Sequence, residues 1–139
     1  MGSQVTTATA INSIVEQSGS VNISQRVLHA IQSAAAKTGV DFSYLMTKAS
    51  QESSFDPTAK ASTSTATGLF QFTNQTWLHM VKDYGDKYGL GNYVSHITVD
   101  SDGRLTVENS TARQAILGLR NDPQISAEMA GELDKENAT

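Results

Sequence analysis

Apolar residues recur every three or four positions in several stretches of the chain, which is the spacing of one face of an α-helix. In residues 24–38 this stripe runs from Val27 to Ala35, with Ser24 in the capping position and Gly39 directly after the pattern. A serine at the start and a glycine after the end are preferred helix boundaries. The pattern therefore predicts a capped amphipathic helix over residues 24–38.

A second apolar stripe follows Asp41, which can cap a helix with its apolar side at residues 45–49. This helix has to end by Asp56, because Pro57 disfavours helical backbone in the residue before it. The pattern therefore predicts that Glu52 lies in the last turn of the second helix.

Three more helices are predicted farther along. Thr73 and Thr76 can cap a helix whose apolar stripe runs from Trp77 to Tyr84. Two further helices follow, one around residues 112–119 and one with Pro123 in its first turn. We expect Trp77 to be a core residue. The apolar residues of the last helix are Ile125, Met129 and Leu133.

Other stretches lack the helical spacing. Residues 1–22 are rich in Ser, Thr, Asn, Gln and Ala, which bury little, so we expect a flexible leader or linker. Residues 58–67 are small and hydroxyl-rich and predict a loop. Residues 97–107 alternate β-formers around a turn at residues 100–103, which predicts a β-hairpin that forms a mobile flap beside the site. The sequence thus predicts one mainly α domain, residues 23–139, with a small β-hairpin flap.

The composition narrows the chemistry and the partners. The formal net charge is −4, and the basic residues are scattered rather than gathered into a stripe, which argues against nucleic acid. Cysteine is absent, which excludes thiol nucleophiles and Cys-ligated zinc. His29, His79 and His96 lie far apart without metal-ligand spacing, so we expect no metal site. No apolar run approaches the roughly 20 residues of a membrane-spanning helix.

Glu52 differs from most of the acidic residues, which lie among polar neighbours. It lies at a helix end, between an aliphatic stripe and Phe55, directly before the hydroxyl-rich loop. Apolar neighbours favour the protonated form of a carboxyl group, and a general acid near neutral pH needs that form. Glu52 is therefore the candidate acid, with a simple helix-end glutamate as the alternative.

Three segments in order strengthen this interpretation. They are QESSFDP at residues 51–57, GLFQF at residues 68–72 and the pair Thr76-Trp77. Together they resemble the Glu-Ser and Gly-Leu-Met-Gln motifs of the soluble lytic transglycosylase family, part of the lysozyme-like superfamily. The resemblance covers roughly residues 24–84 and implies a lysozyme-like helical domain.

In that family the Glu of Glu-Ser is the single catalytic residue, and the matching position is Glu52. The resemblance implies that Glu52 protonates the oxygen between N-acetylmuramic acid and N-acetylglucosamine, while the substrate's acetamido group stabilises the cationic centre. Glu52 then takes the proton of the muramic C6 hydroxyl, which closes a 1,6-anhydro ring. No cofactor is implied. The expected partner is the glycan strand of peptidoglycan. The resemblance also implies a monomer that is exported to the periplasm or cell envelope, where the protein can serve envelope machinery.

The same resemblance assigns substrate contacts. Gln71 matches the Gln of the second motif, whose amide can bond sugar hydroxyl or acetamido groups. Phe70 stands where Met is common, and its ring can pack on a sugar face or fill the core. Counting back from Gln71, Ser62 aligns with a loop serine that contacts the acetamido group, whereas counting forward from the first motif gives Ala61. Ser53 can touch substrate or end its helix.

One motif of the family has no clear match. It is an Ala-x-Asn-Tyr segment whose Tyr hydrogen-bonds the catalytic Glu, and nothing after residue 110 resembles it. Residues 126–133 resemble a helix of a divergent subgroup in which the aromatic segment lies farther downstream. We therefore expect the domain to be truncated at its C-terminal end, with Tyr93 as a candidate substitute.

Two other functions stay open at this point. A muramidase would use Asp56 to activate water, although a residue before proline is also a common turn former. A noncatalytic glycan-binding or assembly module would keep the fold without turnover. An anhydro product end indicates a transglycosylase, whereas a reducing product end indicates a muramidase. Turnover of either kind excludes the noncatalytic module.

Overall fold

Capping residues set the boundaries of the first helices in the computed structural model, which describes residues 23–138. Helix α2, Gln25–Thr38, begins after Ser24, whose hydroxyl oxygen accepts a hydrogen bond from the backbone N–H of Val27, and ends at Gly39. The prediction of a helix over residues 24–38 is thereby confirmed. The predicted leader, residues 1–22, lies outside the described residues.

The next two helices also follow their predicted caps. Helix α3, Phe42–Ser53, begins after Asp41, whose side chain accepts from the N–H of Tyr44. Helix α4, Asn74–Tyr84, begins after Thr73. Because these caps are local, the sequence alone was sufficient to place both helices.

The second half of the domain adds several short elements and one long helix, α7. They are η1 Gly85–Tyr88, α5 Gly91–Val94, β1 Thr98–Val99, β2 Leu105–Thr106, α6 Ser110–Gly118, η2 Leu119–Asn121 and α7 Pro123–Ala138. The one-turn elements η1 and α5 were not predicted, because they are too short to show a hydrophobic period. The described part of the chain is mainly helical with one two-stranded sheet, which confirms the predicted fold class. None of its helices is long and apolar enough to cross a membrane.

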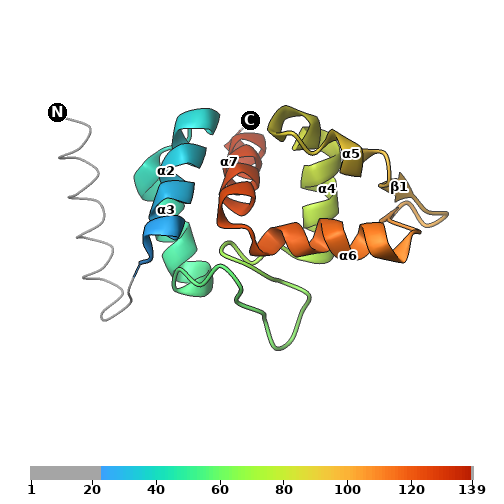
Figure 1. Ribbon diagram of the computed structural model, residues 1–139, viewed down its shortest axis with the longest axis horizontal. Coiled ribbons are helices and arrows are strands. Elements are labelled where there is room, and N and C mark those ends of the chain that lie inside the picture. Colours follow the sequence, from blue (N-terminus) through green and yellow to red (C-terminus); the bar gives the residue numbers. More distant parts are fainter. Residues whose placement is uncertain (1–22, 139) are drawn as a thin grey trace.

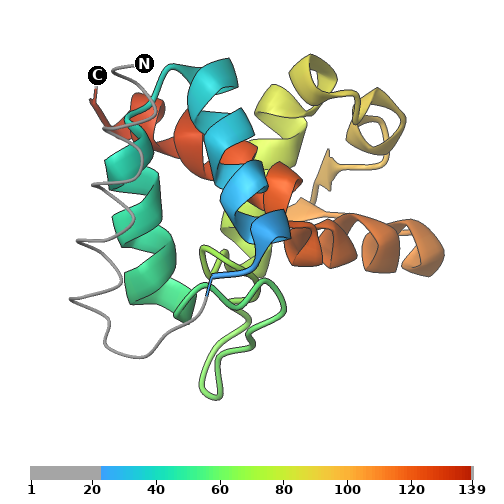
Figure 2. The same cartoon turned by 60° about the vertical axis from the view of Figure 1, so that its left-hand side comes forward.

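Helix α7 lies in the middle of the domain (Figures 1 and 2). Helices α2 and α3 lie on one side of it and α4 with α5 on the other, while α6 runs across one end. Gly131 of α7 permits the close packing with α2, because a Cβ there would come within 2.6 Å of the Thr38 hydroxyl oxygen. The sequence predicted an apolar stripe at Ile125, Met129 and Leu133, but only Met129 is fully buried. A helix surrounded by others also buries its small and polar residues.

The predicted β-hairpin forms, but it does not lie beside the candidate site. Strands β1 and β2 pair antiparallel, with Thr98 opposite Thr106. The Gln75 side chain holds β2 against α4, because its amide donates to the Leu105 carbonyl oxygen at 2.8 Å and accepts from the Leu105 N–H at 3.1 Å. In Figure 1 the hairpin lies at the end of the domain opposite α3. The expected flap beside the candidate site is therefore not supported.

Trp77 lies in the centre of the core, as predicted. Its side chain is 0% exposed, and the indole N–H donates to the carbonyl oxygen of Ile116 at 2.8 Å. Its ring centroid lies 5.0 Å from that of Phe72, and the ring planes are inclined by 59°. Trp77 thus connects α4 both to α6 and to the segment that carries the second motif.

Candidate active site

Glu52 lies in the last turn of α3, on the helix face that also carries Tyr44 and Lys48. Its side chain is 39% exposed, and Lys48 Nζ lies 3.5 Å from Glu52 Oε2. The apolar shelter expected from the sequence is therefore only partial, because one side of the carboxylate faces solvent and an ammonium group.

The chain reverses direction directly after Glu52. Ser54 and Phe55 both have left-handed backbone, with φ values of 52° and 66°. Such values are unfavourable for residues with a Cβ and persist only where the surroundings enforce them. Burial of Phe55, which is 4% exposed in the core, provides that enforcement. The strained turn fixes where α3 ends and hence where Glu52 lies.

Ser53 connects the two motifs. Its hydroxyl donates to the carbonyl oxygen of Leu69 at 2.7 Å and lies 3.1 Å from that of Ala49. Leu69 precedes the Phe70-Gln71 pair, so this bond fastens the end of α3 to the turn of the second motif. Ser53 is occupied with holding the site together rather than lining it.

Gln71 organises the turn of the second motif with its own side chain. Its backbone is left-handed, with φ of 55°. The side-chain Nε2 donates to the carbonyl oxygens of Ala59 at 3.0 Å and Gly68 at 2.9 Å. Because both amide hydrogens are used within the protein, the amide oxygen is the group that Gln71 can offer to a ligand.

Glu52, Phe70 and Gln71 line one pocket of about 250 Å³. The pocket lies between the end of α3, the turn of the second motif, the start of α4 and the C-terminal half of α7. Its other lining residues are Tyr44, Leu45, Lys48, Phe72, Thr73, Thr76, Ala130, Leu133, Asp134 and Asn137. The ring of Phe70 is 8% exposed, so most of it fills the core and only a part faces the pocket.

Four candidate residues do not line this pocket: Ser53, Ser62, Tyr93 and Asp56. Ser62 is an exposed residue of the loop, and Tyr93 packs from α5 against the core. Asp56 accepts hydrogen bonds from the N–H and the hydroxyl of Thr58, at 2.9 and 3.1 Å. Asp56 therefore has the turn-forming role that its position before proline suggested.

Sequence reasoning missed three charged or aromatic residues of the pocket. Tyr44 and Lys48 precede Glu52 by two turns and one turn of α3, so helical periodicity could have found them. Asp134 comes from α7, so no periodicity in the sequence relates it to Glu52. Burial raises the pKa of the Tyr44 hydroxyl, and the negative charge and hydrogen bond of Asp134 raise it further.

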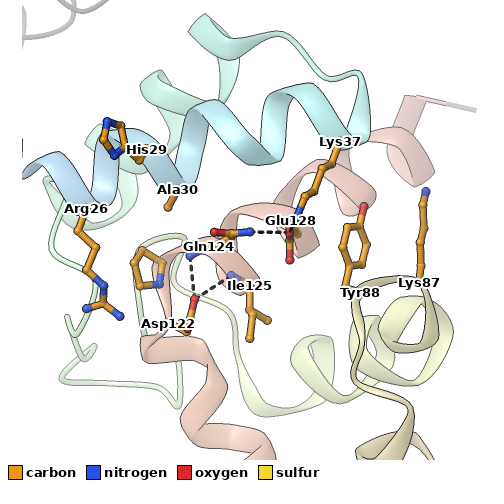
Figure 3. Close-up of a pocket in the computed structure, with 11 residues that line it drawn as sticks. Arg26, His29, Ala30, Lys37, Lys87, Tyr88, Asp122, Gln124, Ile125 and Glu128 are labelled. Carbon is orange, nitrogen blue, oxygen red and sulfur yellow. Dashed lines mark hydrogen bonds and ion pairs between the residues drawn. The ribbon is translucent and has the colours of Figure 1, made fainter.

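A larger cleft, of about 780 Å³, lies against the opposite face of α7 (Figure 3). Several of its charged residues have partners within the protein: Lys37 Nζ donates to Glu128 at 3.0 Å, and Asp122 accepts from the N–H groups of Gln124 and Ile125. The cleft contains no residue of either motif. We therefore assign the chemistry to the smaller pocket.

A second cluster lies on the seam between α4 and α7. His79 Nδ1 is 3.1 Å from Asp83, and His79 Nε2 is 3.2 Å from Glu136. These residue types can bind a cation, which the sequence did not indicate. Both ring nitrogens face carboxylates, so the imidazole bridges α4 to α7.

The described residues form a mainly helical domain with a small antiparallel sheet, which is consistent with a lysozyme-like fold. Residues 29–95 match the family model described as Transglycosylase SLT domain. The two sequence motifs predicted a match to this family, and the match is confirmed over these residues. SLT domains act on peptidoglycan in the cell envelope. The match includes the whole of α3 and α4 and the loop between them, which carry both motifs.

Proposed function

We propose that this chain is a lytic transglycosylase that cleaves the β-1,4 bond between N-acetylmuramic acid and N-acetylglucosamine and leaves a 1,6-anhydro-muramic end. The observation that carries the proposal is the single pocket in which Glu52, Phe70 and Gln71 lie together. The two motifs are separated by an irregular loop, so their meeting in one pocket is a property of the fold.

Glu52 serves in both steps of the proposed reaction. As an acid it protonates the bridging oxygen, and as a base it takes the proton of the muramic C6 hydroxyl, whose oxygen then bonds to C1. A glycan bound across the pocket would cover the exposed side of Glu52 and exclude water, which favours ring closure over hydrolysis.

The pocket provides complementary groups for an amino sugar. The Gln71 amide oxygen can accept a hydrogen bond from a sugar hydroxyl or an acetamido N–H, since its NH₂ group is occupied. The apolar surfaces of Tyr44 and Phe70 suit the apolar faces of sugar rings. These contacts orient the strand so that the scissile bond lies at Glu52.

The disposition of the other carboxylates favours a mechanism with one catalytic acid. Asp56 is bonded into the turn with Thr58 and does not line the pocket. The other carboxylate of the pocket, that of Asp134, interacts with the hydroxyl of Tyr44. If the enzyme were a muramidase, Asp134 would therefore be a better candidate for the water-activating base than Asp56.

The site of action follows from the substrate. Peptidoglycan is found in the envelope, so the proposal places the protein in the periplasm or at the cell wall after export. The proposed reaction needs only one copy of the chain, because Glu52, Phe70 and Gln71 line the same pocket.

The test compares wild type with Glu52→Gln, Asp56→Asn and Asp134→Asn on purified sacculi, with the released muropeptides identified by mass. We expect anhydro products from wild type and from Asp56→Asn, and a loss of at least about 100-fold for Glu52→Gln. Undiminished release by Glu52→Gln would refute the assignment. Reducing-end products that disappear in Asp134→Asn would identify a muramidase, and binding without turnover by wild type would identify a glycan-binding module.

A further inference from the structure

Arg120 is a buried cation that sequence reasoning did not single out. It lies in η2 and is 7% exposed. Arginine is seldom buried unless its donors are satisfied. Among the described residues no carboxylate pairs with it, and burial lowers the pKa of its guanidinium from its usual value, although the group stays protonated. Its charge is instead balanced by carbonyl oxygens.

Those carbonyl oxygens belong to the segment that forms the second motif. Arg120 Nη1 donates to Thr65 at 2.8 Å and to Phe72 at 3.0 Å, while Nε donates to Leu117 in its own helical segment at 2.9 Å. One guanidinium group thus joins both ends of residues 65–72 to the end of α6. This segment contains Phe70 and Gln71.

The backbone of Arg120 also contacts this turn. Gly68 has φ of +91°, and a Cβ at this position would lie 2.1 Å from the Arg120 carbonyl oxygen. The carbonyl oxygen of Gly68 accepts hydrogen bonds from both the backbone N–H and the side-chain amide of Gln71. The contacts therefore form a continuous path from Arg120 to Gln71.

We propose that Arg120 is a positioning residue that holds residues 65–72 in the conformation that presents Phe70 and Gln71 to the glycan pocket. Gln71 has an unfavourable left-handed backbone, which persists only where the surroundings enforce it. Without the guanidinium, the carbonyl oxygens of Thr65 and Phe72 lose a buried donor, and the turn relaxes. The catalytic consequence of this inference rests on the proposed function, whereas its structural consequence does not.

The first measurement follows the turn directly, by amide hydrogen exchange in wild type, Arg120→Lys and Arg120→Met. We expect exchange in residues 65–72 to accelerate by about tenfold or more in Arg120→Met, with α2 and α3 unchanged, and by less in Arg120→Lys. The matched control is Arg113→Met, because Arg113 is an exposed arginine of α6 that donates to the Val107 carbonyl oxygen at 2.9 Å and does not contact the turn. If Arg120→Met does not fold, exchange in Arg120→Lys is compared with exchange in wild type.

The second measurement uses soluble glycan strands below the melting temperature of each variant. We expect KM to rise by about tenfold in Arg120→Met with a smaller change in kcat, and partial recovery in Arg120→Lys, because the turn binds substrate while Glu52 lies elsewhere. Unchanged exchange in residues 65–72, or acceleration that is equal throughout the domain, would overturn the proposal. If wild type does not cleave glycan, the proposed function fails but the exchange result still decides the role of Arg120.

Discussion

Lys87 Nζ donates a hydrogen bond of 2.8 Å to Glu132 Oε2, which links η1 to the middle of α7. The Glu132 side chain is 2% exposed, and the hydroxyl of Tyr88 also donates to it. Burial on its own would raise the pKa of Glu132, but the hydrogen bonds from Lys87 and Tyr88 and the positive charges of Lys135 and Lys87 together outweigh it and hold that pKa below its usual value. Glu132 is therefore a buried anion that the fold stabilises.

The first prediction concerns acid stability. A carboxyl group with a depressed pKa stabilises the fold above its unfolded pKa, and this stabilisation is lost as the pH falls through the folded pKa. We expect Glu132→Gln to lower the free energy of unfolding by about 1–3 kcal/mol at pH 7, with the difference shrinking below about pH 4. Urea unfolding of wild type and Glu132→Gln, at pH 7 and below about pH 4, measures this difference. The exposed Glu108→Gln serves as control, and an equal effect in that variant would contradict the prediction.

The second prediction concerns alkaline pH. A hydrogen bond to Glu136, together with burial, raises the pKa of Tyr84 to about 12. A raised tyrosine pKa means that stability is intact below the unfolded pKa near 10 and declines as the pH rises above it. We expect Tyr84→Phe to remove a component of the tyrosinate absorbance titration with a midpoint near pH 12. In denaturant the wild type should lose that late component, and its persistence there would argue against a folded-state cause.

The third prediction concerns the strained turn after α3. Ser54 is exposed and has φ of 52°, which costs free energy for any residue with a Cβ. We therefore expect Ser54→Gly to stabilise the protein by about 0.5–1 kcal/mol. Ser54→Ala keeps the Cβ and should change stability by less than about 0.5 kcal/mol. Thermal unfolding compares the two, and a destabilised glycine variant would mean that the serine side chain makes a contact that matters.

The fourth prediction separates catalysis from folding at Glu52. The ion pair with Lys48 is exposed at both ends, and such pairs contribute about 0–1 kcal/mol. Glu52→Gln should therefore keep its melting temperature close to that of wild type while turnover is lost. Lys48→Met should also fold normally. If Glu52→Gln unfolds substantially earlier, its loss of turnover cannot be attributed to acid/base chemistry.

The helix boundaries could be predicted because their causes are local. Ser24, Asp41 and Thr73 each cap a helix that starts at the next residue, so a short window of sequence contains the whole signal. The surroundings of α7 could not be predicted in this way. Glu128 is buried because Lys37, 91 positions earlier, donates to it, and a solvated charge was the reasonable expectation for that carboxylate.

The candidate site shows the same division. Glu52 and Gln71 were found from two motifs in sequence, but the assignment of Ser62 depended on a spacing that the longer loop had altered. The position of Tyr93 near the predicted hairpin suggested a role in the site, but Tyr93 packs against the core instead. Arg120 reaches Thr65 across 55 positions, so only the folded chain shows that it supports the site.

The position of Trp77 gives this protein a natural optical probe. It is the only tryptophan in the sequence, it is fully shielded from water, and its ring lies against Phe72, the residue after Gln71. An indole in such an apolar environment emits at shorter wavelength than one in water, and its emission responds to small movements of neighbouring groups. Glycan binding that shifts the turn should therefore change the fluorescence of the unlabelled protein, which allows binding by inactive variants to be titrated.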